Sequence, residues 1–327
     1  MPGEEGVYLG TNQICTGCRS PMKLQNGDWQ EFQDTVPFNG RSVKRRTKIN
    51  QAIRQCDIHR QSSHLRLEEA KTEIQGHLKP NGKVQSFSVD LSTNYDDVKN
   101  CVTEAEEKFG PVFMLVNSAG TSVSRSFQDL DAIEFKKLME ANYYSAVNAT
   151  KASIDSMVGQ QAGRVVFLSS QAGQIGLFGF SAYSASKFAL RGLAEALQME
   201  MTPHNVRVTV AFPPDTDTPG FQHELQGKPK ETMLISETAG LLKPQDVAHT
   251  IISDSLKGEF TSYQGIDGWM LANISAGMSP ATSLYKVIEQ FLLMGILRVV
   301  GLFYLASFDS IVLKCKKERE VEKQKKS

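Results

Sequence analysis

The stretch "RVVFLSSQAGQIGLFGFSAYSASKFALRGLAEALQMEM" (residues 164–201) contains two kinds of secondary structure joined by a loop. It begins with a short, continuous apolar run, which is typical of a strand buried on both faces of a parallel sheet. It ends with a run over 185–201 whose apolar residues recur at helical spacing. The loop between them is rich in glycine (Gly173, Gly176 and Gly179) and ends in Tyr-Ser-Ala-Ser-Lys. A buried strand that leads into an amphipathic helix predicts one unit of an α/β fold.

The same alternation extends along the chain on both sides of this unit. Helical patterns occur at 66–78, at 96–110 with Gly110 as the terminator, and at 134–158. Strand patterns occur at 83–90, 112–120 and 206–212. Alternating strands and helices predict an α/β doubly wound parallel sheet of the Rossmann-like kind.

Small and polar residues cluster where these expected strands end. The ends are Asp90, 117–120 ("NSAG"), 169–173 ("SSQAG") and 213–220 ("PPDTDTPG"). In open parallel sheets ligands bind beyond the carboxyl ends of the strands. The pattern therefore predicts a ligand site at this edge.

Tyr183 and Lys187 carry the clearest chemistry at this edge. They lie four residues apart at the start of an expected helix and so share one face. A nearby ammonium favours the phenolate and lowers the pKa of a tyrosine, which allows the pair to exchange a proton with a substrate oxygen. Ser170, at the end of the preceding strand, is placed to hold the same oxygen. A tyrosine and a lysine at this spacing also occur together by chance in many helices.

Together with "LVNSAG" upstream, "SSQAGQIGLFGFSAYSASK" resembles the short-chain dehydrogenase/reductase family. The resemblance implies that Tyr183 donates a proton to a substrate carbonyl and that Lys187 lowers the pKa of Tyr183 and holds the nicotinamide ribose. It implies that Ser170 binds the carbonyl, with the adjacent Ser169 as the competing candidate. Asn142 would hold a water that relays protons. The implied substrate contacts are Ser169, Ser170 and Tyr183.

The family resemblance also implies a nicotinamide dinucleotide, expected to be NADPH, although the residues that would choose between NADPH and NADH are not recognisable. Its implied contacts are Asp90, Asn117, Ala119, Gly120, Tyr183, Lys187, Pro213, Thr216 and Thr218. Further motifs, among them "PPDTDTPGF" and "FYLASFDSI", resemble family members that reduce the 3-keto group of a long-chain sphingoid base at the endoplasmic reticulum. The substrate expected on this basis is a long-chain sphingoid ketone. A homo-oligomer is compatible with the family.

The family's glycine-rich phosphate loop has no counterpart in residues 1–65. The Gly173-Gly176-Gly179 series follows a late strand, and no acidic residue stands after it at the ribose spacing. Backbone N–H groups of such a loop hold the pyrophosphate at a helix start. We therefore expect a Rossmann-like sheet that lacks its first strands, and the alternative to an active reductase is a catalytically inactive isoform.

The chain divides by composition into four segments. We expect a poorly ordered segment over 1–65 and a reductase domain over 66–270. We expect an apolar membrane-associated region over 271–313 and a basic tail over 314–327. The run 291–308 is near spanning length but contains Arg298, and spanning, re-entrant and interfacial arrangements are all compatible with it. The last lysines resemble a dilysine retrieval signal, which places the protein at the endoplasmic reticulum membrane with its catalytic domain facing the cytosol.

Composition excludes several other classes of function. Basic and acidic residues balance at 36 each, so no nucleic-acid partner is expected. Five cysteines in 327 residues suit a reducing compartment. Cys15, Cys18, His59 and His64 lack a zinc-finger spacing, so no metal site is expected.

Overall fold

The computed structural model describes residues 63–78, 82–237 and 240–326. Four strands form its parallel sheet, in the order β1-β2-β3-β4. These strands are β1 (Met114–Asn117), β2 (Gly163–Leu168), β3 (Val206–Phe212) and β4 (Thr261–Tyr263). The register aligns Leu115 with Val165 and Val165 with Val208, so the apolar residues of neighbouring strands stand side by side.

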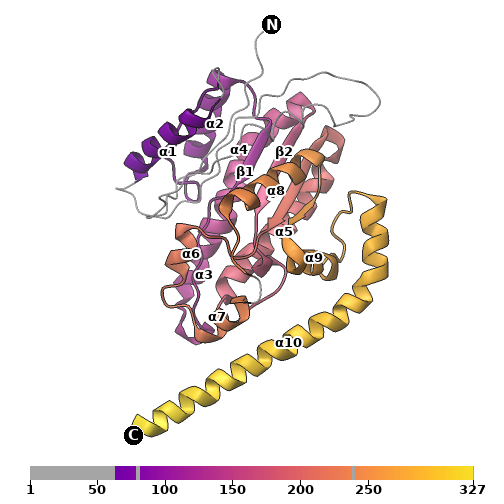
Figure 1. Ribbon diagram of the computed structural model, residues 1–327. Coiled ribbons are helices and arrows are strands. Elements are labelled where there is room, and N and C mark those ends of the chain that lie inside the picture. Colours follow the sequence, from indigo (N-terminus) through magenta and orange to yellow (C-terminus); the bar gives the residue numbers. More distant parts are fainter. Residues whose placement is uncertain (1–62, 79–81, 238–239, 327) are drawn as a thin grey trace.

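Helices cover this sheet and extend beyond it (Figure 1). They are α1 (Ser63–His77), α2 (Tyr95–Phe109), α3 (Ala132–Met139), α4 (Ser145–Gln160), α5 (Ser181–Met201), α6 (Pro219–Glu224), α7 (Lys230–Ser236), α8 (Pro244–Lys257), α9 (Gly265–Ile274) and α10 (Leu284–Lys326). Short helical turns lie at Phe127–Asp129, Glu140–Tyr144, Gln171–Gly173 and Thr202–His204.

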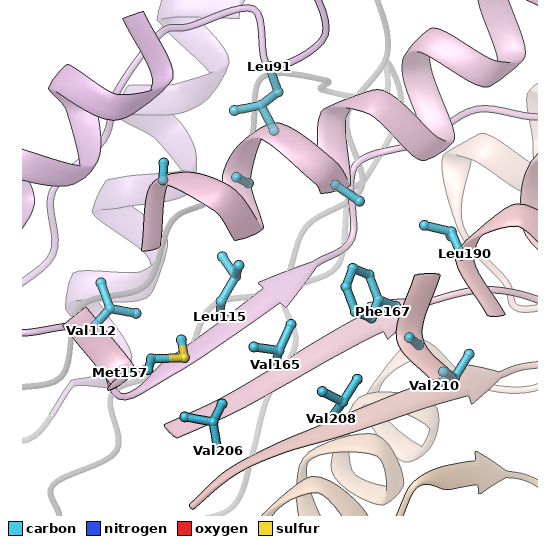
Figure 2. Packing of buried hydrophobic residues seen from close by; sticks show 14 of the residues in the cluster. Leu91, Val112, Leu115, Met157, Val165, Phe167, Leu190, Val206, Val208 and Val210 are labelled. Atoms are coloured by element: carbon cyan, nitrogen blue, oxygen red, sulfur yellow. The ribbon is translucent and has the colours of Figure 1, made fainter. Parts of the chain in front are cut away.

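The sheet is buried on both faces, which explains the continuous apolar strand runs in the sequence. On one face Leu115, Val165 and Val208 point toward α4 and α5, where Met157 and Leu190 meet them (Figure 2). On the other face the alternate strand residues pack against α8; this second cluster contains Met114, Val116, Val166, Ala211, Val247, Ile251 and Ile252. Because successive strand residues point to opposite faces, helices on both sides favour apolar residues at most positions.

The structure confirms the expected helices and most of the expected strands, with four differences. The expected strand at 83–90 is not part of the described sheet, although Phe87 and Val89 still pack against the core. An alternation of apolar and polar residues alone cannot specify a strand, because a strand also needs a neighbouring strand for its backbone hydrogen bonds. The short strand β4 was not predicted, because three residues are too few to give a periodic signal.

The third difference is in the long helix expected at 134–158. It is divided into α3 and α4 by a π-helical turn at Glu140–Tyr144, which contains Asn142. Such turns are rare and often mark functional sites, because they change the direction of one side chain. The basic tail expected as a separate segment from residue 314 continues α10 without a break.

Candidate active site

A cavity of about 350 Å³ lies at the carboxyl ends of the strands. Ser118 follows β1, Ser169 and Ser170 follow β2, and Pro213 follows β3, and all four line the cavity. The position agrees with the expectation for a parallel sheet, where these ends meet at one edge. The far wall consists of residues of α9 and α10, mainly Met270, Leu271, Ile274, Arg298, Tyr304, Leu305 and Phe308.

The adjacent serines after β2 have different partners. The Ser169 hydroxyl donates to the backbone carbonyl of Lys187 at 3.0 Å, and Ser169 is buried. The Ser170 hydroxyl accepts the Ala172 N–H at 3.2 Å and is also hydrogen-bonded to the Tyr183 side chain. Ser169 therefore fastens β2 to α5, while Ser170 is the serine that meets the tyrosine.

Tyr183 stands in the first turn of α5 and faces the cavity. Burial raises its pKa above the ordinary value, and the carboxylates of Glu224 and Asp215 raise it further, while the hydrogen bond from Ser170 acts in the opposite direction. Lys187 Nζ lies 5.6 Å from the ring centroid, and the expectation that it lowers this pKa stays a prediction. The phenol is the protonated form at neutral pH, as it is for a tyrosine at its ordinary pKa.

Lys187 lies one turn after Tyr183 on the same helix face, and it is buried. Its Nζ donates to the Leu168 carbonyl at 2.8 Å, which ties the lysine to the end of β2. Burial lowers the pKa of Lys187 from 10.5 to about 8. The ammonium is therefore still the main form at pH 7, but it loses its proton far more readily than a surface lysine.

Asn142 reaches the site from the π-helical turn. Its amide donates to the Thr121 carbonyl at 3.0 Å and to the Ser186 hydroxyl at 2.8 Å, and its carbonyl accepts the Thr121 N–H at 2.7 Å. A Cβ added at Gly120 would stand 2.7 Å from this carbonyl oxygen and 3.5 Å from Lys187 Nζ, so only glycine fits there. The Asn142 side chain thus joins the loop after β1 to α5, and the expected proton-relaying water stays a prediction.

The residues expected to contact a cofactor separate into two groups. Tyr183, Lys187, Pro213, Thr216 and Thr218 line the cavity, and the Thr218 hydroxyl also caps α6 by accepting the Phe221 N–H at 3.2 Å. The other members do not line it: Asp90 accepts from Ser92 at the surface, buried Asn117 donates to Thr150 at 3.0 Å, Ala119 packs against the core, and Gly120 contacts Asn142.

Sequence reasoning missed two residues that contact the cavity lining, Lys228 and Ser186. The Lys228 ammonium is buried and lies 3.1 Å from the Glu224 carboxylate and 3.5 Å from that of Asp215. Ser186 was also missed, although it stands inside Tyr-Ser-Ala-Ser-Lys and its hydroxyl donates to the Tyr183 carbonyl at 2.7 Å. A local signal existed for Ser186, but none existed for a charge cluster whose members come from the loop after β3, from α6 and from the segment after α6.

Two expectations concern residues that the structure describes only in part. No group of three metal-binding side chains occurs in the described part of the chain. Cys15, Cys18 and His59 lie outside it, as does the segment 1–62 in which a phosphate loop was sought.

The cavity residues fit the nicotinamide end of a dinucleotide. The buried ammonium of Lys187 and the hydroxyls of Ser170 and Tyr183 line one space, and Gln171 Nε2 in its wall lacks a hydrogen-bond partner.

Comparison with known proteins agrees with this geometry. Residues 53–229 match the family model described as short chain dehydrogenase. The chain is 52% identical over 256 residues to the 3-dehydrosphinganine reductase of Danio rerio, which covers 78% of this chain and 77% of that protein. It is 53% identical over 251 residues to the 3-ketodihydrosphingosine reductase of Bos taurus, which covers 76% of both.

A solved structure shares the fold. Levodione reductase superposes with a TM-score of 0.55 at 23% identity, which covers 63% of this chain and 84% of that chain. The parallel sheet, the Ser170–Tyr183–Lys187 arrangement and these matches lead to one conclusion. The chain belongs to the short-chain dehydrogenase family.

Proposed function

We propose that the protein reduces the 3-keto group of 3-ketodihydrosphingosine to dihydrosphingosine, with NADPH as the reductant, in sphingolipid biosynthesis. The observation that carries the proposal is the composition of the cavity. Ser170, Tyr183 and Lys187 stand at one end, and the apolar side chains of α9 and α10 stand at the other. The names of the relatives from Danio rerio and Bos taurus support this substrate.

The catalytic end suits the reduction of a ketone. The family's enzymes use nicotinamide cofactors, and a nicotinamide held at this end would supply the hydride for the carbonyl carbon. Tyr183 donates its proton to the carbonyl oxygen, since a tyrosine phenol is protonated at neutral pH. Ser170 holds the same oxygen by a hydrogen bond. The Lys187 ammonium stabilises negative charge that develops on the oxygen and on Tyr183.

The far end suits a hydrocarbon chain. Met270, Leu271 and Ile274 come from α9, and Leu305 and Phe308 from α10. These side chains are apolar, although Asp267 and Arg298 also line this end. Burying apolar surface is favourable at about 25 cal/mol per Å². A long-chain ketone can therefore be held with its carbonyl at Tyr183 and its tail along the two helices.

The protein is membrane-associated, and α10 is the described helix that is long and apolar enough for it. We propose the endoplasmic reticulum as its location, with the catalytic domain on the cytosolic side. The lysines near the carboxyl terminus, Lys323 and Lys325, support this placement through their resemblance to a retrieval signal. Imaging of the tagged full chain tests it, and loss of the reticular pattern is expected when both lysines become serine.

Cofactor binding is tested first, and turnover is tested second. NADPH and NADH are titrated into the purified chain while cofactor fluorescence is followed, and saturable binding with a preference for NADPH is expected. No saturable binding up to millimolar cofactor contradicts the proposal and favours the inactive isoform.

The second step uses a matched pair of tyrosine variants. Tyr183→Phe removes the proton donor and is expected to lower kcat by roughly 10²- to 10⁴-fold, with cofactor affinity retained. Tyr144→Phe removes an equivalent hydroxyl from an exposed residue outside the cavity and is expected to leave kcat unchanged. Full turnover by Tyr183→Phe refutes the assignment of the acid.

A further inference from the structure

The helix α10 contacts the catalytic domain at both of its ends. Near its start, Trp269 Nε1 donates to Glu289 at 2.7 Å and Lys286 pairs with Glu259 at 2.6 Å. Near its end, Lys230 of α7 pairs with Glu318 at 2.7 Å. Figure 1 shows α10 running along the edge of the domain past α9 and α7.

Contacts also occur between these ends. Leu297 is buried, and a Cβ added at Gly301 would stand 3.2 Å from the Ile274 side chain of α9. Cys315 is buried as well, at 2% exposure. The inner face of the helix lines the catalytic cavity with Arg298, Gly301, Tyr304, Leu305 and Phe308. One stripe of α10 therefore faces the domain from end to end.

The opposite stripe is apolar and exposed. Leu292, Val299 and Phe303 are 62%, 53% and 73% exposed, and Ile296 between them is 64% exposed. Leu292 and Phe303 are eleven residues apart, which returns to nearly the same direction around a helix. The other side of the helix already packs against the domain. An exposed apolar stripe of this length indicates contact with an apolar partner.

These contacts conflict with a perpendicular crossing of a bilayer. Glu289 and Arg319, which bonds the buried Glu231 of α7, are thirty residues apart, or about 45 Å along a helix. The hydrocarbon core is about 30 Å thick. If α10 crossed it upright, the parts of the domain bound along the helix, with the charges of Asp267 and Arg298, would have to lie within hydrocarbon, where charge is costly.

We propose that α10 lies in the plane of the membrane surface, with its Leu292–Phe303 stripe in the lipid and its opposite stripe forming the wall of the catalytic cavity. The residues after the apolar run, 314–327, contain seven basic and three acidic side chains, which suits a surface of anionic lipid headgroups. A lipid substrate then passes from the bilayer into the cavity beside α10 without crossing water. The arrangement rests on membrane association and not on the identity of the ketone.

The test measures the depth of two side chains on the outer stripe. Leu292→Cys and Phe303→Cys are made in full chains whose native cysteines are alanine, labelled with a fluorophore, and bound to vesicles of phosphatidylcholine and phosphatidylserine. Lipids that carry nitroxide groups at shallow or deep positions quench the label according to its depth. Met199→Cys is the control, since Met199 is 70% exposed on α5 and outside the stripe.

An in-plane helix predicts that both labels are quenched, most strongly by the shallow nitroxide and to the same extent, while the control is not quenched. A spanning helix predicts depths that differ by about 16 Å, and that result overturns the proposal. Absence of quenching at both positions also overturns it, as expected if a second copy of the chain covers the stripe. Neither cofactor nor substrate is present, so the result is independent of the proposed reaction.

A second measurement uses the chain with its native cysteines. Phe303→Glu is expected to reduce the fraction bound to the same vesicles by about tenfold or more, because a charge replaces an apolar anchor in the lipid. Met199→Glu is expected to bind like the unaltered protein. Equal binding by the two variants contradicts the in-plane placement of the stripe.

Discussion

The three glycines of the loop before Tyr183 have different surroundings, and this difference can be tested by adding one methyl group. At Gly173 a Cβ would collide with the Ser169 hydroxyl and stand 3.0 Å from the backbone carbonyl oxygen of Lys187. At Gly176 no atom lies within 4 Å of the added Cβ. Neither residue has a positive φ, so backbone strain does not contribute to the comparison.

Gly173→Ala is expected to destabilise the protein and to disturb the active site together. The colliding atoms are a buried hydroxyl and a helix backbone, neither of which is a flexible side-chain end, so the cost should match that of overpacking a core, about 1–3 kcal/mol. For a domain of this size, that corresponds to a fall in Tm of roughly 2–10 °C. Moving the Lys187 backbone also shifts its ammonium, and misplacement near 1 Å can lower the rate by about a hundredfold.

Gly176→Ala is the matched control. It adds the same methyl group three residues away and is expected to leave the free energy of unfolding unchanged or to raise it by about 0.4–1 kcal/mol, since alanine restricts the unfolded chain. Urea unfolding and ketone reduction are measured for both variants. If Gly173→Ala is as stable and as active as Gly176→Ala, the close packing of Gly173 against Ser169 and Lys187 is refuted.

Three further outcomes follow from the contacts of the site and of α10. Since the pKa of Lys187 is lowered to about 8, the ammonium is present below that pH, so kcat should fall as the pH rises through about 8; a pH–rate profile that is flat through this range contradicts the role of its charge. Asn142→Ala leaves both backbone groups of Thr121 without their partner and should lower the free energy of unfolding by about 1–3 kcal/mol, measured with urea. Arg319→Gln removes the counter-charge of the buried Glu231 carboxylate and should make the end of α10 more sensitive to limited proteolysis.

Two substitutions serve as controls for these last changes. Asn100→Ala alters an exposed asparagine on α2 and should leave the unfolding curve in place. Lys316→Gln removes a lysine from an exposed pair with Glu320, and exposed pairs contribute little. If Lys316→Gln accelerates proteolysis of α10 as much as Arg319→Gln, the contact with Glu231 does not hold the helix.

Much of the fold follows from local patterns in the sequence. The continuous apolar runs predicted β1, β2 and β3, because a strand covered by helices on both faces needs apolar residues throughout. Gly110 predicted the end of α2, where it takes φ 87°, a backbone conformation that other residues avoid. Tyr183 and Lys187 were found because both lie on one helical turn, where spacing in sequence determines proximity.

Only the tertiary structure determined the contacts between residues that are distant in sequence. The choice between Ser169 and Ser170 depended on where α5 lies relative to β2. The pKa of Tyr183 depended on burial and on carboxylates from α6 and from the loop after β3. The contacts of α10 with α9 and α7, through Glu289 and Glu318, also could not be predicted from the apolar run 291–308. Periodicity reports the direction of a side chain relative to its own helix or strand, whereas its partners, its burial and hence its proton affinity are set only when separate elements pack together.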